Sequence, residues 1–468
     1  MQQRSIETRQ NIITAALALF SKQGYDAAAV AEICESAKVS KGAFYYHFSS
    51  KQAVFLALFQ DWLSSLDQQM DKLQQSDFSV PETLRFMTEL IPQIIATAGD
   101  SFRIFLEFWN QASRDRLGRS IAAGHRSTFR RDYVEDQMIL VTGATGHIGN
   151  VLVRQLLNLG ARVRALVLTG EDISPIAEHD VDIVEGDVLD PECLEIAHRD
   201  VDHVYHLASL ITIMPGKNKL VQLVNVTGTK NMLQAAVQAG VKRFVYTSSI
   251  HAIARIPKGK VVDENLPYDP SNHYGEYDRS KAQASLMVEQ AARDGLNAVI
   301  ACPTGVIGPW DYRRSEVGEV IRTCVDGKLQ LYLDGAYDFV DVRDVAQGLI
   351  QTGERGRRGE SYILSGEKIT VPDLINTVIE ITGKRLPKIK VPIRLAKFAA
   401  NFTPAYYRLT KQEARFTPYS IEVLQSNADI INLKAKSELG YTTRPLYDTL
   451  VDTVQWVLQQ RDQAPVPR

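Results

Sequence analysis

The sequence of 468 residues has few cysteines and no regular cysteine framework. Its four cysteines are far apart and form no C-x-x-C pair, which argues against a disulfide scaffold or a zinc site. They are Cys34, Cys193, Cys302 and Cys324. We therefore expect reduced thiols and no bound metal.

The chain also lacks an excess of charge and a long apolar run. Its 53 Lys and Arg residues nearly balance 55 Asp and Glu residues, so no overall basic field indicates a nucleic-acid binder. No apolar stretch approaches the roughly 18 residues needed to span a bilayer. The polar start MQQRSIETRQ lacks the apolar core of a signal peptide. These absences predict a cytoplasmic protein.

Two segments of different character follow one another along the chain. Residues 1–136 have the pattern of one helix after another, whereas from Met138 short β-branched runs alternate with helical stretches. That alternation is typical of a parallel α/β sheet. We expect an all-α part followed by an α/β Rossmann domain with a doubly wound parallel sheet. The expected boundaries are 1–56, 57–136 and 137–468.

The N-terminal pattern predicts a helix-turn-helix. Apolar residues at helical spacing between Arg9 and Phe20 indicate a first helix, which we expect Gly24 to end. A second short helix is expected over 29–37. Ser40 is placed to cap a third, because its hydroxyl can accept an unpaired backbone N–H. Two short helices joined by a tight turn form this motif.

The stretches IITAALALFSKQGYDAAAVAEICESAKVS and VSKGAFYYHFSSKQAVF resemble the DNA-binding domain of TetR-family repressors over about residues 5–60. The resemblance implies that the helix from Ser40 enters the major groove of a double-stranded DNA operator. The implied contact residues are Ser40, Lys41, Gly42, Tyr45, Tyr46, His47 and Lys51. Lys51 would reach a phosphate, whereas Phe44 and Phe48 are expected in the core.

Residues 52–133 are expected to form a shortened TetR-like helical part. The expected helices are roughly 51–75, 81–97, 101–113 and 118–133. In that family two further long helices pair the subunits, but here the sequence changes character first. We therefore expect the second segment to supply the two-fold axis of a homodimer.

The second segment opens with the strand 138–142, the loop GATGHIG over 143–149 and an amphipathic helix. In this context the loop is typical of a dinucleotide site. Gly143 permits the tight turn, Gly146 lets the backbone approach a pyrophosphate, and Gly149 lets helix and strand pack closely. Backbone N–H groups at the helix start stabilise the phosphate charge.

The next strand, 162–168, should end at the residue that selects the cofactor. An acidic residue there accepts from a ribose hydroxyl of NAD, and an arginine pairs with the 2′-phosphate of NADP. This sequence offers Leu168, and then Glu171 and Asp172, which fit neither rule cleanly. The lack of an arginine favours NAD over NADP slightly.

A tyrosine and a lysine follow at a spacing that suits acid–base chemistry. FVYTSS at 244–249 is a strand ending in hydroxyls, and YDRSK at 277–281 begins a helix. The i, i+4 spacing places Tyr277 and Lys281 on one helix face. We expect the ammonium to lower the pKa of the phenol, so that it exchanges a proton with a substrate hydroxyl or carbonyl. Ser249, or its neighbour Ser248, would hold the same oxygen.

Together VTGATGHIG, GDV, HLA, NVTGTKNML, YTSS, YDRSK and CPTGVIGP resemble the extended short-chain dehydrogenase/reductase family over roughly 138–460. Within it, dihydroflavonol-reductase and sugar-epimerase-type enzymes are the nearest group. The resemblance implies catalysis by Ser249, Tyr277 and Lys281 on a secondary alcohol or ketone, with NAD or NADP. The implied cofactor-binding residues are Gly143, Thr145, Gly146, His147, Ile148, Gly149, Asp187, Val188, Leu207, Ala208, Ser209, Asn225, Lys281, Pro303 and Val306.

Several interpretations stay open at this point. The substrate could be a nucleotide sugar or a flavonoid- or sterol-like compound. The chain could instead be a transcription regulator whose reductase part senses NAD(P)(H) or a metabolite, or the junction could be accidental. His251, His273, Tyr274 and Glu276 are candidates to touch substrate, with a plain loop role as the alternative.

One basic stretch remains to be interpreted. Residues 384–415 hold nine Lys or Arg residues and one acidic residue, interleaved with aromatic side chains. The pattern favours a solvated cap helix, then a cap over the substrate, above a membrane-surface element. Membrane contact is therefore not expected.

Overall fold

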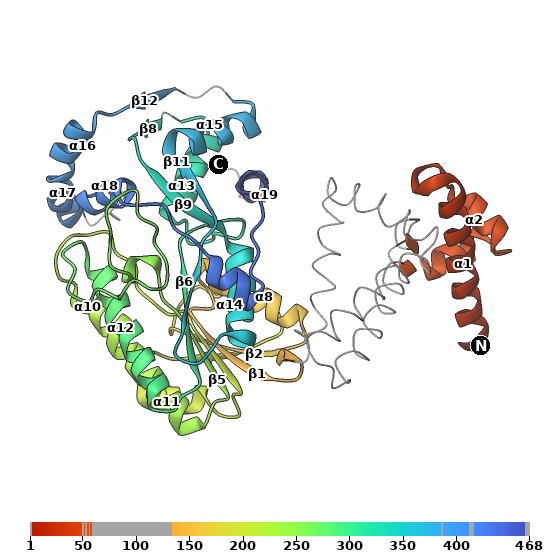
Figure 1. The fold of residues 1–468 in the computed structure, drawn as a ribbon, viewed down its shortest axis with the longest axis horizontal. Helices are drawn as coiled ribbons and strands as arrows, with labels where there is room; N and C mark the ends of the chain where they lie inside the picture. Colours follow the sequence, from red (N-terminus) through yellow and green to blue (C-terminus); the bar gives the residue numbers. More distant parts are fainter. Residues whose placement is uncertain are drawn as a thin grey trace, which may run out of the picture. The chain divides into compact units, whose positions relative to one another are not determined.

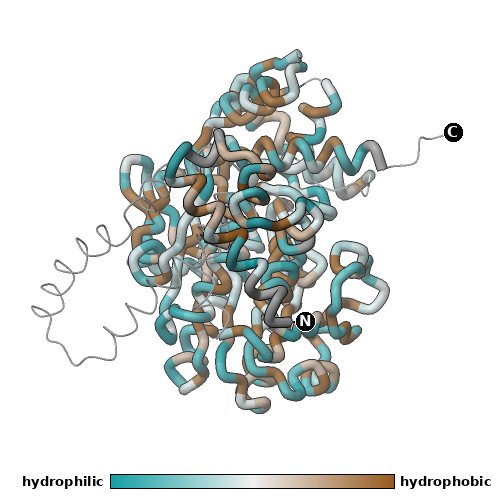
Figure 2. The backbone as a smooth tube through the Cα atoms, turned by 90° about the vertical axis from the view of Figure 1, so that its right-hand side faces the viewer, coloured by the Kyte–Doolittle hydropathy of each residue, from teal (hydrophilic) through white to brown (hydrophobic). Residues whose placement is uncertain are grey.

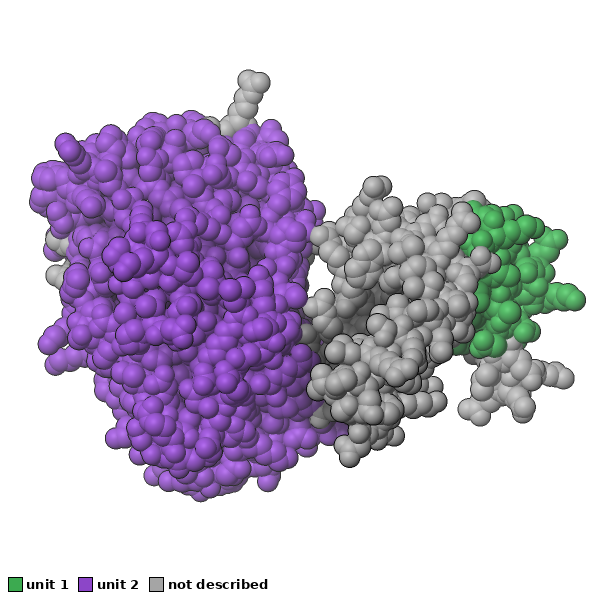
Figure 3. Space-filling view, in the orientation of Figure 1, with its two compact units in different colours: residues 1–129 green, residues 130–468 purple. Residues whose placement is uncertain are grey.

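A computed structural model describes residues 2–48, 51, 54–55, 57–58, 133–328, 330–384, 387–410 and 416–463. The chain divides into two compact units, residues 1–129 and 130–468 (Figure 3). The helices expected at 81–97 and 101–113, and nearly all of the residues of 51–75 and 118–133, lie outside the described residues.

The N-terminal unit begins with α1 (Gln2–Ala27), α2 (Val30–Ser36) and α3 (Lys41–His47). Gly24 does not end the first helix, so that prediction was wrong. A glycine inside a helix costs only about 1 kcal/mol, which the rest of a long helix can absorb. The N-cap prediction is confirmed, because Ser40 Oγ accepts the Ala43 N–H at 3.1 Å.

A small apolar core holds these three helices together. Ile12, Ala16 and Ile33 are fully buried, and Phe44 and Phe48 are 0% and 5% exposed, as expected for core aromatics. At the start of α2, where the sequence has alanines, Glu32 Oε2 accepts the Ala29 N–H at 2.9 Å. The Glu32 carboxylate thus satisfies the backbone N–H of the N-cap residue, but Ala29 has no hydroxyl with which to cap the N–H groups of the first turn.

The C-terminal unit is built on a seven-stranded sheet with the order β10-β6-β5-β4-β1-β2-β3 (Figure 1). All neighbouring strands run parallel. The order reverses between β1 and β4, which is the switch point where such sheets bind ligands. The predicted doubly wound Rossmann fold is confirmed. Its strands are β1 (Met138–Thr142), β2 (Arg162–Val167), β3 (Val181–Glu185), β4 (His203–His206), β5 (Arg243–Thr247), β6 (Ala298–Pro303) and β10 (Ser361–Leu364).

Helices cover both faces of this sheet. Successive residues of a strand point to opposite faces, so Ile139 and Val141 pack in one buried cluster and Leu140 in the other. This is why the central strands are apolar throughout. One face carries α8 (His147–Asn158) and α14 (Val342–Arg355). The other carries α9 (Pro191–Ala197), α11 (Thr229–Ala239) and α12 (Glu276–Arg293). Figure 2 shows apolar and polar residues alternating along the chain.

Residues after β6 form a smaller part against the carboxyl ends of the strands. Two small sheets join β11-β9-β7 and β12-β8. Their strands are β7 (Gly305–Ile307), β8 (Gln330–Tyr332), β9 (Ala336–Asp341), β11 (Glu367–Thr370) and β12 (Lys388–Lys390). The helices are α13 (Glu316–Val325), α15 (Val371–Thr382), α16 (Ile393–Ala400), α17 (Thr403–Thr410), α18 (Pro418–Gln425) and α19 (Leu446–Gln463).

Short helical segments complete the unit. They are α10 (Lys219–Gln222), the π-helical η2 (Leu223–Gly228), the 3-10 helix η3 (Ile250–Ala252) and the π-helical η4 (Ala435–Leu439). Across the described parts of the chain, every helix is too short or too polar to traverse a bilayer.

Candidate functional site

The glycine loop between β1 and α8 has the geometry of a dinucleotide cradle. Gly143 has φ +69°, and a Cβ there would lie 2.9 Å from the Ala208 backbone nitrogen. A Cβ at Gly149 would overlap the Gly143 carbonyl oxygen. Gly146 turns back on the loop, its N–H donating to the Gly143 carbonyl at 3.1 Å. The backbone thus passes close to α8, whose first N–H groups can face a pyrophosphate.

The end of β4 is tied to the end of β1 through Thr142. Its Oγ1 accepts the Leu207 and Ala208 N–H groups at 3.2 and 3.0 Å. Its hydroxyl also lies 2.8 Å from His206 Nδ1, and His206 Nε2 lies 3.0 Å from Thr229 Oγ1. Burial lowers the pKa of His206 to about 3, so the ring is neutral. These contacts hold Leu207 and Ala208 against the glycine loop.

The two histidines of β4 have separate partners. His203 Nδ1 lies 3.1 Å from the Tyr133 hydroxyl, away from the partners of His206. Among the described residues, no group of His, Cys, Asp and Glu side chains is placed to hold a metal ion.

Asn225 links the loop after β4 to α12. This side chain is 1% exposed and lies in η2. Its Oδ1 accepts from Ser209 Oγ at 3.2 Å, and its Nδ2 donates to Ser280 Oγ at 2.9 Å. The expected cofactor residues Ser209 and Asn225 therefore contact each other, and Asn225 also contacts the helix that carries Tyr277.

An acidic side chain occupies the end of β2. Glu171 Oε2 accepts the Leu168 N–H at 3.0 Å, and its Oε1 accepts from the Thr145 hydroxyl at 2.6 Å. Arg313 forms an ion pair with Glu171 and donates to Thr145 Oγ1 at 2.8 Å. Arg313 was not predictable from the sequence, because it lies 168 residues beyond Thr145 and no local pattern connects them.

The other expected cofactor residues surround the same loop. Asp187 Oδ1 accepts the Leu189 N–H at 2.9 Å, and Val188 packs against Gly228. His147 Nε2 lies 3.0 Å from the Pro309 carbonyl oxygen. Ile148 and Val306 are half-buried and pack on one core cluster. Pro303 ends β6 in register with Leu364 of β10.

Ser249, Tyr277 and Lys281 come together at the carboxyl end of β5. Ser249 precedes η3, and Tyr277 and Lys281 lie one turn apart at the start of α12; their exposures are 6%, 9% and 3%. The Tyr277 hydroxyl and Ser249 share a hydrogen bond. Ser248 Oγ instead lies 2.6 Å from Ser285 Oγ. The geometry favours Ser249 over Ser248 as the partner of the phenol.

The expected electrostatic effect of Lys281 on Tyr277 is wrong. Burial raises the pKa of Tyr277 to about 12, and the hydrogen bond from Ser249 opposes this only in part. Lys281 Nζ donates to the Thr247 carbonyl at 2.7 Å, and burial lowers its own pKa to about 7. The ammonium is therefore poorly stabilised and does not lower the phenol pKa. A phenol that stays protonated is suited to donate a proton.

The lowered pKa of Lys281 predicts a pH dependence of stability. Its folded value of about 7 lies below its ordinary value of 10.5, so between pH 7 and 9 the unfolded chain binds more protons at this site. The free energy of unfolding should rise with pH by up to about 1.4 kcal/mol per unit from this group. Urea unfolding at pH 7, 8 and 9 should show that Lys281→Met removes this slope. If the unfolding free energies of the wild type and of Lys281→Met rise equally with pH, Lys281 is not the group responsible.

A buried polar network lies beside Tyr277. Asp278 accepts from Arg255 at 2.9 Å and from the Tyr419 hydroxyl at 2.6 Å. His251 Nε2 lies 2.8 Å from the Tyr337 hydroxyl, and the His251 and Tyr277 ring centroids are 6.3 Å apart. These residues come from segments far apart in the sequence, so only His251 was expected from the sequence.

The other three residues that the sequence suggested as possible substrate contacts interact with nearby side chains. Tyr274 lies beneath the Arg255 guanidinium, 3.7 Å from the ring centroid. Glu276 pairs with Arg279 at 2.5 Å. His273 is exposed and stacks near Tyr274. Of the four candidates, His251 is among the residues that line the pocket described next.

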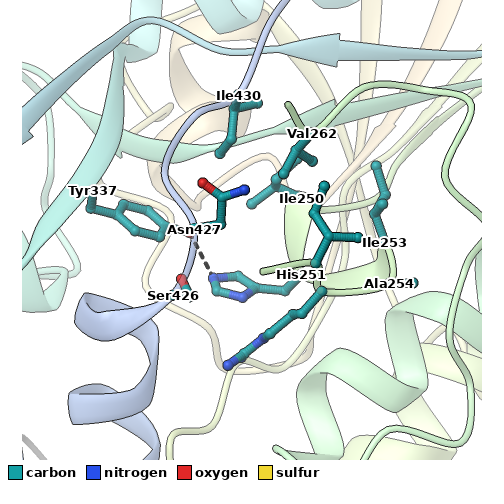
Figure 4. A pocket seen from close by; sticks show the side chains of 11 residues that line it. Ile250, His251, Ile253, Ala254, Val262, Tyr337, Ser426, Asn427 and Ile430 are labelled. Atoms are coloured by element: carbon teal, nitrogen blue, oxygen red, sulfur yellow. Dashed lines mark hydrogen bonds between the residues drawn. The ribbon is translucent and has the colours of Figure 1, made fainter. Parts of the chain in front are cut away.

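This pocket lies beside the Tyr277 site and is largely apolar (Figure 4). His251, Arg255 and Tyr337 line it together with Asn427 and Ser426. The apolar part of its lining consists of Ile250, Ile253, Ala254, Ile256, Val262 and Ile430. Its volume of about 40 Å³ is far below the roughly 300–1,000 Å³ of pockets that hold a whole drug-sized ligand, so in this structure it has room for one small group of a ligand.

Some of the residues expected to contact DNA are exposed on α3, and others are not. Tyr45 is 55% exposed, and Lys41 and Gly42 are exposed as well. His47 is half-buried, and the Tyr46 side chain lies outside the described residues. Lys51 Nζ donates to the Ala28 carbonyl at 2.8 Å, so in this structure it braces the start of α2.

Family models match both units. Residues 139–365 match the NAD dependent epimerase/dehydratase family, and residues 12–58 match the bacterial regulatory proteins of the tetR family. The chain is 34% identical over 319 residues to sterol demethylase protein B of Methylococcus capsulatus, covering 68% of this chain and 97% of that protein. It is 29% identical over 334 residues to a 3-beta-hydroxysteroid dehydrogenase of Mycolicibacterium neoaurum, covering 66% and 88%.

Solved structures support the same grouping. The crystal structure of gox2253 is 33% identical, with a TM-score of 0.62 over 69% of this chain and 99% of that one. PA4631, a nucleoside-diphosphate-sugar epimerase from Pseudomonas aeruginosa, is 25% identical, with a TM-score of 0.56 over 69% and 98%. The chain therefore belongs to the NAD-dependent epimerase/dehydratase family of extended short-chain dehydrogenases/reductases, and it carries a TetR-type helix-turn-helix domain at its N-terminal end.

Proposed function

We propose that this enzyme interconverts a secondary alcohol and a ketone on an apolar, ring-containing substrate, with NAD as the preferred cofactor. The observation that carries the proposal is the Ser249–Tyr277 pair beside a pocket lined mainly by isoleucine, valine and alanine. The glycine loop supports the choice of a dinucleotide cofactor. A Cβ at Gly149 would overlap the Gly143 carbonyl oxygen, so the close packing of loop and helix requires glycine there. The N-terminal part of α8 and the loop residues would hold the pyrophosphate.

The roles of the site residues follow from their contacts. When bound, the dinucleotide supplies or accepts a hydride at the substrate carbon. In the reducing direction the Tyr277 hydroxyl donates its proton to the carbonyl oxygen, which completes the alcohol. Ser249 holds that oxygen through its hydroxyl. Lys281 lies one helical turn from the phenol and can return a proton, since its pKa is about 7.

We infer a sterol- or flavonoid-like substrate rather than a nucleotide sugar from the chemistry of the residues around this pocket, which at about 40 Å³ has room for one apolar group and not for a whole ring system. Among the residues that line it, Arg255 is the cation, and it is committed to Asp278 at 2.9 Å. A diphosphate would need unpaired donors, whereas fused rings need apolar contact. The sterol and hydroxysteroid enzymes among the relatives agree with this choice. The test is turnover of NADH with cyclic ketones of this type against nucleotide-sugar substrates, and greater turnover of the sugars would reject the substrate proposal.

We propose NAD over NADP because Leu168 and Glu171 occupy the end of β2. Leu168 is 54% exposed, and the Glu171 carboxylate beside it holds the nearby Arg313 in an ion pair, so that guanidinium already has an anionic partner other than a 2′-phosphate. Leu168→Arg should raise kcat/KM for NADPH relative to NADH by about tenfold or more, because guanidinium and phosphate pair strongly. Leu168→Gln, which adds no charge, is the control. An unchanged ratio in Leu168→Arg would contradict this account of cofactor choice.

The N-terminal part is a TetR-type DNA-binding domain, and we propose that residues 1–56 read an operator through α3. Residues 57–136 would connect this domain to the enzyme at 137–468. Helix-turn-helix proteins bind two half-sites about 34–36 Å apart as dimers, and we propose that the reductase supplies the two-fold axis. Analytical ultracentrifugation of the full chain tests the homodimer.

A sensor role is the second candidate, because the same chain carries the DNA-binding domain. In that case NAD(H) or a metabolite would alter operator binding with no turnover. The two candidates differ in one measurement, which is whether product forms.

A further inference from the structure

In α16 and α17 most of the large apolar side chains are exposed, although Ile393 of α16 packs on the core. In α16 the buried residues are Ala396 and Ala400, which pack with Leu333 and Ile421. Leu395 and its larger neighbours point outward instead. A helix that only covers a core buries its large residues and exposes its polar ones. For most of the large residues here that order is reversed.

The outward side chains form one stripe, which we call the α16–α17 stripe. Leu395 and Phe398 lie one turn apart on α16, Phe402 lies in the turn between the two helices, and Tyr406 and Leu409 lie one turn apart on α17. Phe398 and Phe402 have ring centroids 5.3 Å apart. Figure 1 shows α16 and α17 at the edge of the unit beside α18. The members and their exposures are Leu395 57%, Phe398 64%, Phe402 61%, Tyr406 51% and Leu409 85%.

Positive charge accompanies the stripe. Residues 384–410 contain seven Lys or Arg residues and no Asp or Glu. Some of these cations have partners outside the segment, since Lys390 pairs with Asp334 at 2.7 Å and Lys388 contacts Asn376. Arg394 and Lys397 are exposed on α16 itself, next to Leu395 and Phe398. Apolar side chains flanked by cations are typical of segments that bury the apolar groups below a layer of negatively charged headgroups and place the cations among them.

We propose that the α16–α17 stripe docks this protein onto an anionic lipid bilayer surface. The basic pattern in the sequence favoured a solvated helix over a membrane-surface element. The exposure of the large apolar residues now favours the membrane-surface element. A second copy of the chain fits less well, because a two-fold contact would set like charges against each other. DNA fits less well too, because leucines gain little from a phosphate backbone. The proposal depends on this surface alone and is independent of the substrate.

Flotation of the full chain with vesicles tests the proposal. At low salt the wild type should float with phosphatidylcholine vesicles that contain phosphatidylglycerol, and much less with pure phosphatidylcholine. The triple variant Leu395→Ser, Phe398→Ser, Phe402→Ser should lose about tenfold or more in partitioning, because three apolar side chains leave the lipid. Arg394→Gln with Lys397→Gln should weaken binding to the anionic vesicles selectively.

The matched control is the triple variant Ile196→Ser, Val237→Ser, Leu433→Ser. These residues are 50%, 59% and 63% exposed and lie elsewhere on the unit. Circular-dichroism melting and NADH binding report whether each variant is folded. Absence of wild-type flotation, or an equal loss in the control triple, would overturn the proposal. So would a stripe variant that keeps its lipid binding but converts a dimer to monomers or loses DNA binding.

Discussion

Replacing Tyr277 by phenylalanine is expected to lower kcat by about 10²–10⁴-fold, the range typical of losing a positioned acid–base group. The phenol is buried and its pKa is raised to about 12, so it stays protonated at neutral pH and is available as the proton donor. NADH affinity should change little, because the substitution removes one hydroxyl. Steady-state kinetics and fluorescence titration of NADH measure both quantities.

Tyr274→Phe is the control for this prediction. Tyr274 lies three residues earlier and contributes its ring face to Arg255, which phenylalanine retains. Its kcat should remain within about threefold of the wild type, since no acid–base role is lost. If Tyr277→Phe also retains activity at that level, Tyr277 is not the proton donor.

Gly149→Ala is expected to weaken NADH binding by about 100-fold or more, because a Cβ there overlaps the Gly143 carbonyl and α8 must move away from the loop. Overpacking of this kind also costs about 1–3 kcal/mol of stability. Isothermal titration with NADH and a thermal melt separate the two effects. Wild-type affinity in this variant would show that the loop does not hold the cofactor.

The control is Gly170→Ala in the loop after β2. Gly170 has φ +77°, and a Cβ there would meet nothing within 4 Å. This change introduces backbone strain of about 1 kcal/mol but no overlap. NADH affinity should therefore stay near the wild-type value. A loss equal to that of Gly149→Ala would mean that general destabilisation explains both.

Local patterns predicted the framework of the site well. The strand, the glycine loop and the helix that follows are adjacent in the sequence, so their order alone specified β1, the Gly143 turn and α8. The i, i+4 spacing likewise placed Tyr277 and Lys281 on one face of α12. These features depend on residues within a few turns of each other.

Features assembled from distant segments were not predictable in the same way. Arg313 reaches Thr145 across 168 residues, and Tyr419 reaches Asp278 across 141. No periodicity records such contacts, because tertiary packing creates them. The pKa of Tyr277 was mispredicted for a related reason, since its burial, rather than the helical spacing to Lys281, dominates. The helix through Gly24 shows how the rest of a long helix overrides one unfavourable residue.

The central claim is that this DNA-binding chain is also a working oxidoreductase, and deuterium transfer tests it most directly. The full chain is incubated with NADH deuterated at C4 and an apolar cyclic ketone, and the alcohol is examined by mass spectrometry and NMR. We predict one deuterium on the carbinol carbon with the wild type, and about 100-fold or more less labelled alcohol in the same time with Tyr277→Phe. Tight NADH binding without label in any product, across sterol-like ketones and nucleotide sugars, would contradict the account and favour the sensor.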